Sequence, residues 1–160
     1  MRERGRGHVV TVASAAAKLA PPGEATYAAT KHGVLGYLTA VREELRGTGV
    51  QITSVMPGVV DTELAAGTTS GAAKMLQPSD VADAVVAVVA KPRFRVFVPG
   101  YIGPAAGLIE LLPQRLRDAV LRKLVPDQVA ATKGSSTRQE YESRLGGAPA
   151  QPGEQKETGA

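Results

Sequence analysis

Residues 8–14 read His-Val-Val-Thr-Val-Ala-Ser, a short run of mostly β-branched and apolar residues that ends in a serine. A run that is apolar on both faces is typical of a strand buried in a parallel sheet. After a loop, Tyr27-Ala-Ala-Thr-Lys31 opens a segment whose apolar residues recur at helical spacing as far as Leu45. The two stretches predict a buried strand over 8–13 followed by a helix over 24–46.

The same alternation of strand and helix continues along the chain. Residues 50–55 form another β-branched, apolar run that Pro57 ends, and residues 94–98 form a third. Between them, valines at helical spacing predict a helix with Ser79 as its N-cap that stops before Pro92. Strands that alternate with helices predict a parallel sheet with right-handed crossovers, so the fold class is α/β.

Composition divides the chain into three parts. We expect one α/β domain over 1–104, an amphipathic helical extension over 105–132 that Pro113 kinks or splits, and a disordered tail over 133–160. The extension is most simply a helix docked on the domain, with a lid over a substrate pocket and a membrane-surface helix as alternatives. Residues 61–73 are rich in Gly, Thr and Ser and form a loop or hold a short helix.

The overall composition excludes several classes of function. The chain has no cysteine, which excludes disulfides and Cys-based zinc sites, and the isolated His8 and His32 argue against any metal site. A chain without disulfides fits the cytoplasm, and no stretch resembles a signal peptide or a membrane span. The net charge of +4 comes from scattered basic residues without interleaved aromatics, so we expect neither a nucleic-acid nor a membrane partner.

Tyr27 and Lys31 lie four residues apart and so share one face of the predicted helix. An ammonium held near a phenol favours the phenolate, which makes a tyrosine better suited to acid/base catalysis. Taken alone, the pair is more simply a solvated helix pair. Ser14 changes this interpretation, because it follows the first strand at the end where open α/β sheets bind their ligands. The three side chains are therefore expected to meet at one crevice.

The chain resembles the short-chain dehydrogenases/reductases over about residues 5–100. The resemblance is carried by Val-Val-Thr-Val-Ala-Ser at 9–14, the spacing from Ser14 to Tyr27, the Tyr-Ala-Ala-Thr-Lys motif, and Pro-Gly-Val-Val-Asp-Thr at 57–62. It implies the carboxy-terminal half of a Rossmann-like, doubly wound parallel sheet, namely its last three strands with their helices. It also implies NAD(P)-dependent hydride transfer between nicotinamide and a ketone or alcohol.

The resemblance assigns a role to each matched residue. Tyr27 is the general acid or base and Ser14 hydrogen-bonds the same substrate oxygen, so Ser14, Tyr27 and Lys31 form the catalytic set. Lys31 also hydrogen-bonds the nicotinamide ribose. The implied cofactor-binding residues are Tyr27, Lys31, Pro57, Gly58, Val60 and Thr62, of which Thr62 and the backbone near Val60 hold the carboxamide.

Each of these residues also has an ordinary structural interpretation. Ser14 could be a turn serine, Thr62 an N-cap for a short helix beginning at Glu63, and Pro57-Gly58 the end of a strand. The order and spacing of the motifs together favour the catalytic interpretation over these. His32 lies on a different helix face from Lys31, and we expect it to have a structural role.

No segment of the sequence matches the first βαβ half of this family, with its glycine-rich turn for the pyrophosphate. The choice between NAD and NADP is consequently open. One interpretation is a truncated oxidoreductase whose isolated chain has doubtful activity, with a hydrophobic ketone or alcohol as substrate and the helix 27–46 as a homo-oligomer contact. The other is a pseudoenzyme or non-catalytic interaction module that uses the exposed edge of the first strand and the Tyr27 helix.

Overall fold

The computed structural model describes residues 1–20, 22–65, 67–71, 74–125, 127–128, 135–136, 140 and 143–144. The elements follow one another as β1 (Gly7–Val12), η1 (Ala15–Ala17), α1 (Ala25–Glu44), β2 (Val50–Pro57), η2 (Glu63–Ala65), α2 (Pro78–Ala90), β3 (Arg95–Val98), α3 (Ile102–Glu110) and α4 (Gln114–Leu124). Most of the tail predicted to be disordered, over 133–160, lies outside the described residues.

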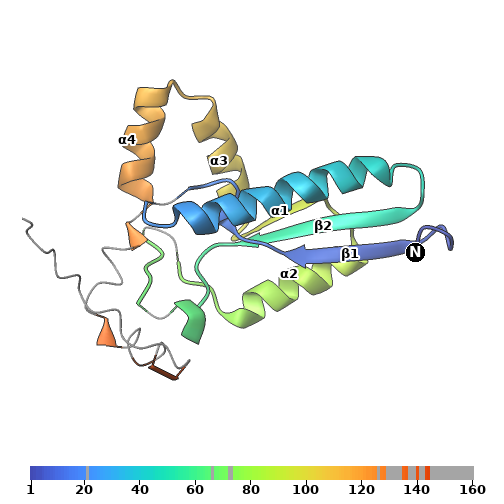
Figure 1. Cartoon of the computed structure of the whole chain (residues 1–160), viewed down its shortest axis with the longest axis horizontal. Coiled ribbons are helices and arrows are strands. Elements are labelled where there is room, and N and C mark those ends of the chain that lie inside the picture. Colours follow the sequence, from blue (N-terminus) through green and yellow to red (C-terminus); the bar gives the residue numbers. More distant parts are fainter. Residues whose placement is uncertain are drawn as a thin grey trace, which may run out of the picture.

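The three strands form one parallel sheet in the order β1-β2-β3, which confirms the predicted α/β class. β1 is in register with β2 from Gly7 opposite Val50 onward, and β3 pairs with the second half of β2, with Pro57 opposite Val98. α1 covers one face of the sheet and α2 covers the other (Figure 1). The sheet is therefore doubly wound, as the sequence predicts.

The core centres on β2, whose residues from Ile52 to Pro57 are all buried. On the α1 side, Ala13, Ala17, Leu35 and Met56 form a continuous apolar cluster. The adjoining Phe94 is covered by two guanidinium groups. The guanidinium of Arg42 in α1 lies 5.0 Å from the ring centroid and that of Arg95 in β3 lies 5.3 Å from it, so the three residues form a cation–π cluster. This cluster fixes the carboxyl-terminal part of α1 against the start of β3.

The two connections between strands differ in hand, which corrects the prediction of right-handed crossovers throughout. The chain moves across the sheet in one direction, from β1 to β2 to β3, yet α1 and α2 lie on opposite faces (Figure 1). The α1 face above β3 is already occupied, because α3 packs there with Gly103 against the Phe97 ring. The apolar stripe of α2 is instead buried on the opposite face, where Val88 is 3% exposed.

The start of α2 also differs from the sequence prediction. Gln77, and not Ser79, is the N-cap, and its backbone N–H donates to Asp80 Oδ2 at 2.8 Å in a capping box. Pro78 occupies the first helical position, where its fixed φ suits a helix and its missing N–H leaves no donor unpaired. The proline therefore begins the helix two residues earlier than a serine cap would.

The helical extension consists of two helices. α3 begins at Ile102, ahead of the expected start near Gly107, and Pro113 separates it from α4 as the sequence predicts. The two helices contact each other and project from the sheet as a hairpin (Figure 1). No helix among the described residues is long and apolar enough to cross a membrane.

A partly buried hydrogen-bond chain runs through Thr53 of β2 and links β1 to the segment just before β3. Thr53 Oγ1 donates to the carbonyl of Arg93 at 2.7 Å, which leaves it to accept from His8 Nε2, also at 2.7 Å. The neighbouring Ser54 Oγ is buried but has no protein partner. Two adjacent buried hydroxyls of β2 thus have opposite roles, one bonded on both sides and the other unpaired.

We predict that Thr53→Val lowers the free energy of unfolding by about 1–3 kcal/mol, because it leaves the His8 N–H and the Arg93 carbonyl unpaired inside the protein. Ser54→Ala is the matched control and leaves that free energy nearly unchanged, since the hydroxyl it removes makes no bond. Urea unfolding followed by circular dichroism measures both. Equal losses in the two variants would contradict the assigned hydrogen-bond chain.

Candidate active site

Ser14 lies just beyond β1, at the carboxyl end of the sheet. Its backbone is extended, with φ −168°, and its Oγ accepts a hydrogen bond from the Ala16 N–H at 3.1 Å. The serine is therefore the N-cap of η1, as its ordinary structural interpretation proposes. The hydroxyl hydrogen is not used in this bond, so Ser14 can still donate to an oxygen outside the loop.

Tyr27 and Lys31 lie on one face of α1, in its first two turns. The Lys31 Nζ is 5.3 Å from the centroid of the Tyr27 ring, so the ammonium lies over the aromatic side chain. The tyrosine is 44% exposed, which leaves it accessible to a ligand from solvent. The predicted pairing of these two side chains is thereby present in the structure.

The packing of α1 brings this pair to the serine end of the sheet. α1 contacts η1 directly, and η1 begins immediately after Ser14. The residues Ala15, Ala16 and Ala17 of η1 are buried, which allows the helix to approach closely. The catalytic residues predicted from the sequence thus come from a loop after β1 and from the adjoining helix, at the same edge of the sheet.

Of the other residues predicted to hold the cofactor, Pro57 ends β2 and Gly58, Val60 and Thr62 follow it at that edge. The Gly58 N–H donates to the Val98 carbonyl at 2.8 Å, and Val60 forms an isolated parallel bridge with Leu76. Thr62 Oγ1 donates to the Val60 carbonyl at 3.4 Å, and the Thr62 carbonyl accepts from Ala65 at the end of η2. The segment after Pro57 is therefore held by its own backbone, with the Thr62 side chain exposed.

Two further titratable residues flank Tyr27. Glu24 precedes α1, and partial burial raises the pKa of its carboxyl above the ordinary value. His32 Nδ1 lies 2.9 Å from the Ala28 carbonyl within α1. This bond to the helix backbone agrees with the structural role expected for His32. Among the described residues, no three acidic or histidine side chains gather as metal ligands would.

Sequence reasoning missed Gln128, which lies four residues beyond α4. Its side chain accepts from the Thr69 N–H at 3.2 Å and donates to the Thr69 carbonyl at 2.9 Å, while its backbone N–H donates to Pro22 at 3.2 Å. Only 8% of the residue is exposed. Gln128 thus connects the loop after η2 with the loop before α1. A lone glutamine carries no sequence pattern that could have indicated these bonds.

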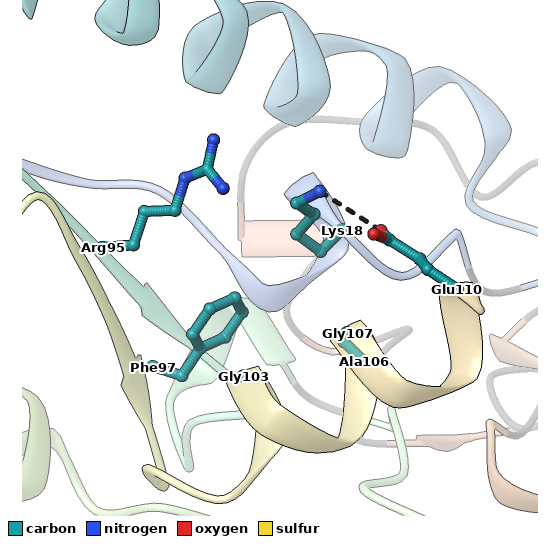
Figure 2. A pocket seen from close by; sticks show the side chains of 7 residues that line it. All are labelled: Lys18, Arg95, Phe97, Gly103, Ala106, Gly107 and Glu110. Atoms are coloured by element: carbon teal, nitrogen blue, oxygen red, sulfur yellow. Dashed lines mark hydrogen bonds and ion pairs between the residues drawn. The ribbon is translucent and has the colours of Figure 1, made fainter.

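A cavity of about 260 Å³ lies on the α1 face between η1, β3 and α3. Its lining consists of Lys18, Arg95, Phe97, Gly103, Ala106, Gly107 and Glu110 (Figure 2). Lys18 Nζ forms an ion pair with Glu110 at 3.2 Å across its rim. None of the three residues predicted to be catalytic lines this cavity, so it is distinct from the candidate active site.

The comparisons with known proteins agree with this arrangement. The family profile described as short chain dehydrogenase matches residues 1–73, which include Ser14, Tyr27, Lys31 and the segment from Pro57 to Thr62. Residues 1–73 therefore belong to the short-chain dehydrogenase/reductase family.

Relatives of this dehydrogenase/reductase chain are oxidoreductases. An uncharacterized oxidoreductase of Myxococcus xanthus is 32% identical over 124 residues, which are 78% of this chain and 49% of the relative. An uncharacterized oxidoreductase of Staphylococcus haemolyticus is 38% identical over 89 residues, which are 56% of this chain and 38% of the relative. The chain therefore spans half or less of the length of these relatives.

Solved structures also match this chain over about half of their own length. A short chain dehydrogenase from Burkholderia cenocepacia in complex with NADP superposes with a TM-score of 0.62 at 26% identity, over 76% of this chain and 48% of that one. Actinorhodin polyketide ketoreductase with NADPH superposes with a TM-score of 0.55 at 30% identity, over 63% of this chain and 49% of that one. This short-chain dehydrogenase/reductase thus shares the fold of nicotinamide-binding enzymes over roughly half of their length.

The two glycines of α3 at the cavity provide a test of the packing there. A Cβ at Gly103 would lie 2.6 Å from the Phe97 ring, whereas a Cβ at Gly107 meets no atom within 4 Å. We predict that Gly103→Ala lowers the free energy of unfolding by about 1–3 kcal/mol through overpacking. Gly107→Ala is the control and raises it by about 0.5–1 kcal/mol, because alanine is the better helix former. Thermal unfolding distinguishes the two, and a stabilised Gly103→Ala variant would contradict the position of α3.

Proposed function

We propose that Ser14, Tyr27 and Lys31 perform the proton transfer of an NAD(P)-dependent oxidoreductase that interconverts a ketone and an alcohol. The observation that carries the proposal is the position of Lys31 over the exposed Tyr27 ring, at the edge of the sheet where Ser14 follows β1. The residues that bind most of the dinucleotide would be supplied by chain outside these 160 residues.

The three side chains divide the chemistry at one oxygen atom. In ketone reduction, the Tyr27 hydroxyl donates its proton to the carbonyl oxygen while a hydride arrives at the carbonyl carbon. In alcohol oxidation, the phenolate accepts the hydroxyl proton while the hydride leaves. The Lys31 ammonium over the Tyr27 ring places a positive charge beside the reacting oxygen, and Ser14 donates a hydrogen bond that orients the substrate oxygen.

The described residues fit the nicotinamide end of such a cofactor. Tyr27 and Lys31 are adjacent on a face of α1 that solvent reaches, and the Thr62 side chain is exposed in the segment after Pro57. Lys31 would hold the ribose, and Thr62 with the backbone near Val60 would hold the carboxamide. The nicotinamide supplies or accepts the hydride when it is bound, whereas the protein contributes orientation and the proton.

A second candidate function is a non-catalytic interaction module derived from this family. Among the described residues β1 pairs with β2 alone, and Val9 and Val12 are 39% and 52% exposed. An unpaired edge with apolar side chains can accept a partner strand. The two functions differ in whether the Tyr27 hydroxyl is needed, because a partner contact does not require a phenolic proton.

Titration with cofactor tests the contribution of these 160 residues alone. We expect NADH and NADPH to bind the chain no more tightly than millimolar, about −4 kcal/mol, because its sequence has no glycine-rich turn for the pyrophosphate. Quenching or transfer of nicotinamide fluorescence measures the binding. Micromolar affinity would show that the 160 residues already bind the dinucleotide, and would overturn this part of the proposal.

Removal of the phenolic hydroxyl tests the chemistry in a longer protein that contains this chain together with a cofactor-binding half. Tyr27→Phe should reduce kcat at least about a hundredfold while leaving the cofactor Kd nearly unchanged, because only proton transfer is lost. Tyr37→Phe is the control on the same helix, since Tyr37 is 68% exposed and outside the site. Turnover is followed by nicotinamide absorbance. A Tyr27→Phe variant with the original kcat would exclude Tyr27 from catalysis.

A further inference from the structure

The α3–α4 hairpin presents an unpartnered apolar stripe to solvent. Tyr101, Leu108 and Leu111 recur at helical spacing and are 58%, 68% and 82% exposed. The opposite side of α3 is packed against the domain through Ile102 and Ala106, which are buried. The exposed stripe is therefore on the outer side of a helix whose inner side already forms its share of the core.

The second helix of the hairpin, which contacts α3, carries positive charge. Leu116, in the first turn of α4, is 56% exposed. α4 contains four basic residues and one acidic residue, and three of the basic residues, Arg115, Arg122 and Lys123, are exposed. Exposed apolar and cationic side chains thus both occur on the α3–α4 hairpin, which projects from the sheet (Figure 1).

We propose that the α3–α4 hairpin is a docking surface for the face of a bilayer that contains anionic lipids. The leucines enter the boundary between headgroups and acyl chains, and the arginines and lysine contact the anionic headgroups. Long basic side chains can lie along the apolar surface while their charged ends stay in the headgroup region. The helices, of nine and eleven residues, lie on the membrane and do not cross it.

Charge distinguishes this surface from the exposed apolar face of α2. Val86 and Val89 of α2 are 69% and 63% exposed, a degree similar to the hairpin leucines. α2 contains two aspartates and no basic residue. A face of that kind gains nothing from anionic lipid, so α2 provides a matched control of equal apolar exposure and opposite charge.

Flotation of the 160-residue chain with lipid vesicles tests the proposal. We expect binding to vesicles of three parts phosphatidylcholine and one part phosphatidylglycerol, and at least tenfold weaker binding to phosphatidylcholine alone. Molar salt should weaken the binding, since it screens the contribution of the cations. Failure to bind the anionic vesicles, or equal binding to both kinds, would overturn the proposal.

Two sets of variants separate the apolar and charged contributions. Leu108→Gln with Leu111→Gln should weaken partitioning at least tenfold at unchanged net charge. Replacement of Arg115, Arg122 and Lys123 by glutamine should weaken it about a hundredfold. Val86→Gln with Val89→Gln should leave it unchanged. Equal loss in the α2 variant, or none in the hairpin variants, would contradict the proposal.

A second copy of this chain is the alternative occupant of the stripe. Sedimentation velocity of the original chain and of the Leu108→Gln, Leu111→Gln variant decides between them. We expect the same sedimentation coefficient for both chains in the absence of lipid. A dimer that the variant abolishes would assign the stripe to self-association and overturn the lipid proposal. We expect each variant to retain its helices, because all of the replaced side chains are exposed. Circular dichroism checks this.

Discussion

The burial of β2 on both faces is the constraint on which the rest of the structure depends. A strand whose residues from Ile52 to Pro57 are all inaccessible must have a strand on each edge and a helix on each side. Those four neighbours are β1, β3, α1 and α2. The helix on one side carries Tyr27 and Lys31, and the strand on one edge leads to Ser14. The geometry of the site is thus a consequence of covering one central strand.

The sequence predicts this arrangement because its strongest patterns belong to its most buried elements. The runs at 8–13 and 50–55 and the stripe of α1 are signals of burial, and they predict the position of Ser14, Tyr27 and Lys31 at one edge of the sheet. The predictions are wrong at the starts of helices, where neighbouring residues compete for the first helical position. Pro78 begins α2 ahead of Ser79, and α3 begins before Gly107 because Ile102 packs into the core. The role of Gln128 was not predicted, because its partners are backbone atoms of loops distant in the sequence and no periodic pattern indicates such contacts.

The proposed function assigns this chain one half of a reaction. Under that proposal its described residues supply a proton donor, a cation beside it and a hydroxyl for orientation, all at the carboxyl edge of the sheet. Dinucleotide binding depends instead on close approach of a glycine-rich backbone to phosphate groups. These two tasks fall on different parts of an α/β sheet. Identity to short-chain dehydrogenase/reductase relatives over half of their length or less is consistent with that division.

The hydrogen bonds of Gln128 have a mechanical consequence. This glutamine is only the fourth residue after the end of α4 at Leu124, and four residues reach at most about 14 Å. While the bonds to Thr69 and Pro22 hold, α4 cannot swing far from either loop. A force applied to the hairpin is therefore transmitted to the segment between η2 and α2 and to the turn that leads into α1. The hairpin, the segment between η2 and α2 and the turn before α1 therefore move together unless the hydrogen bonds of Gln128 break.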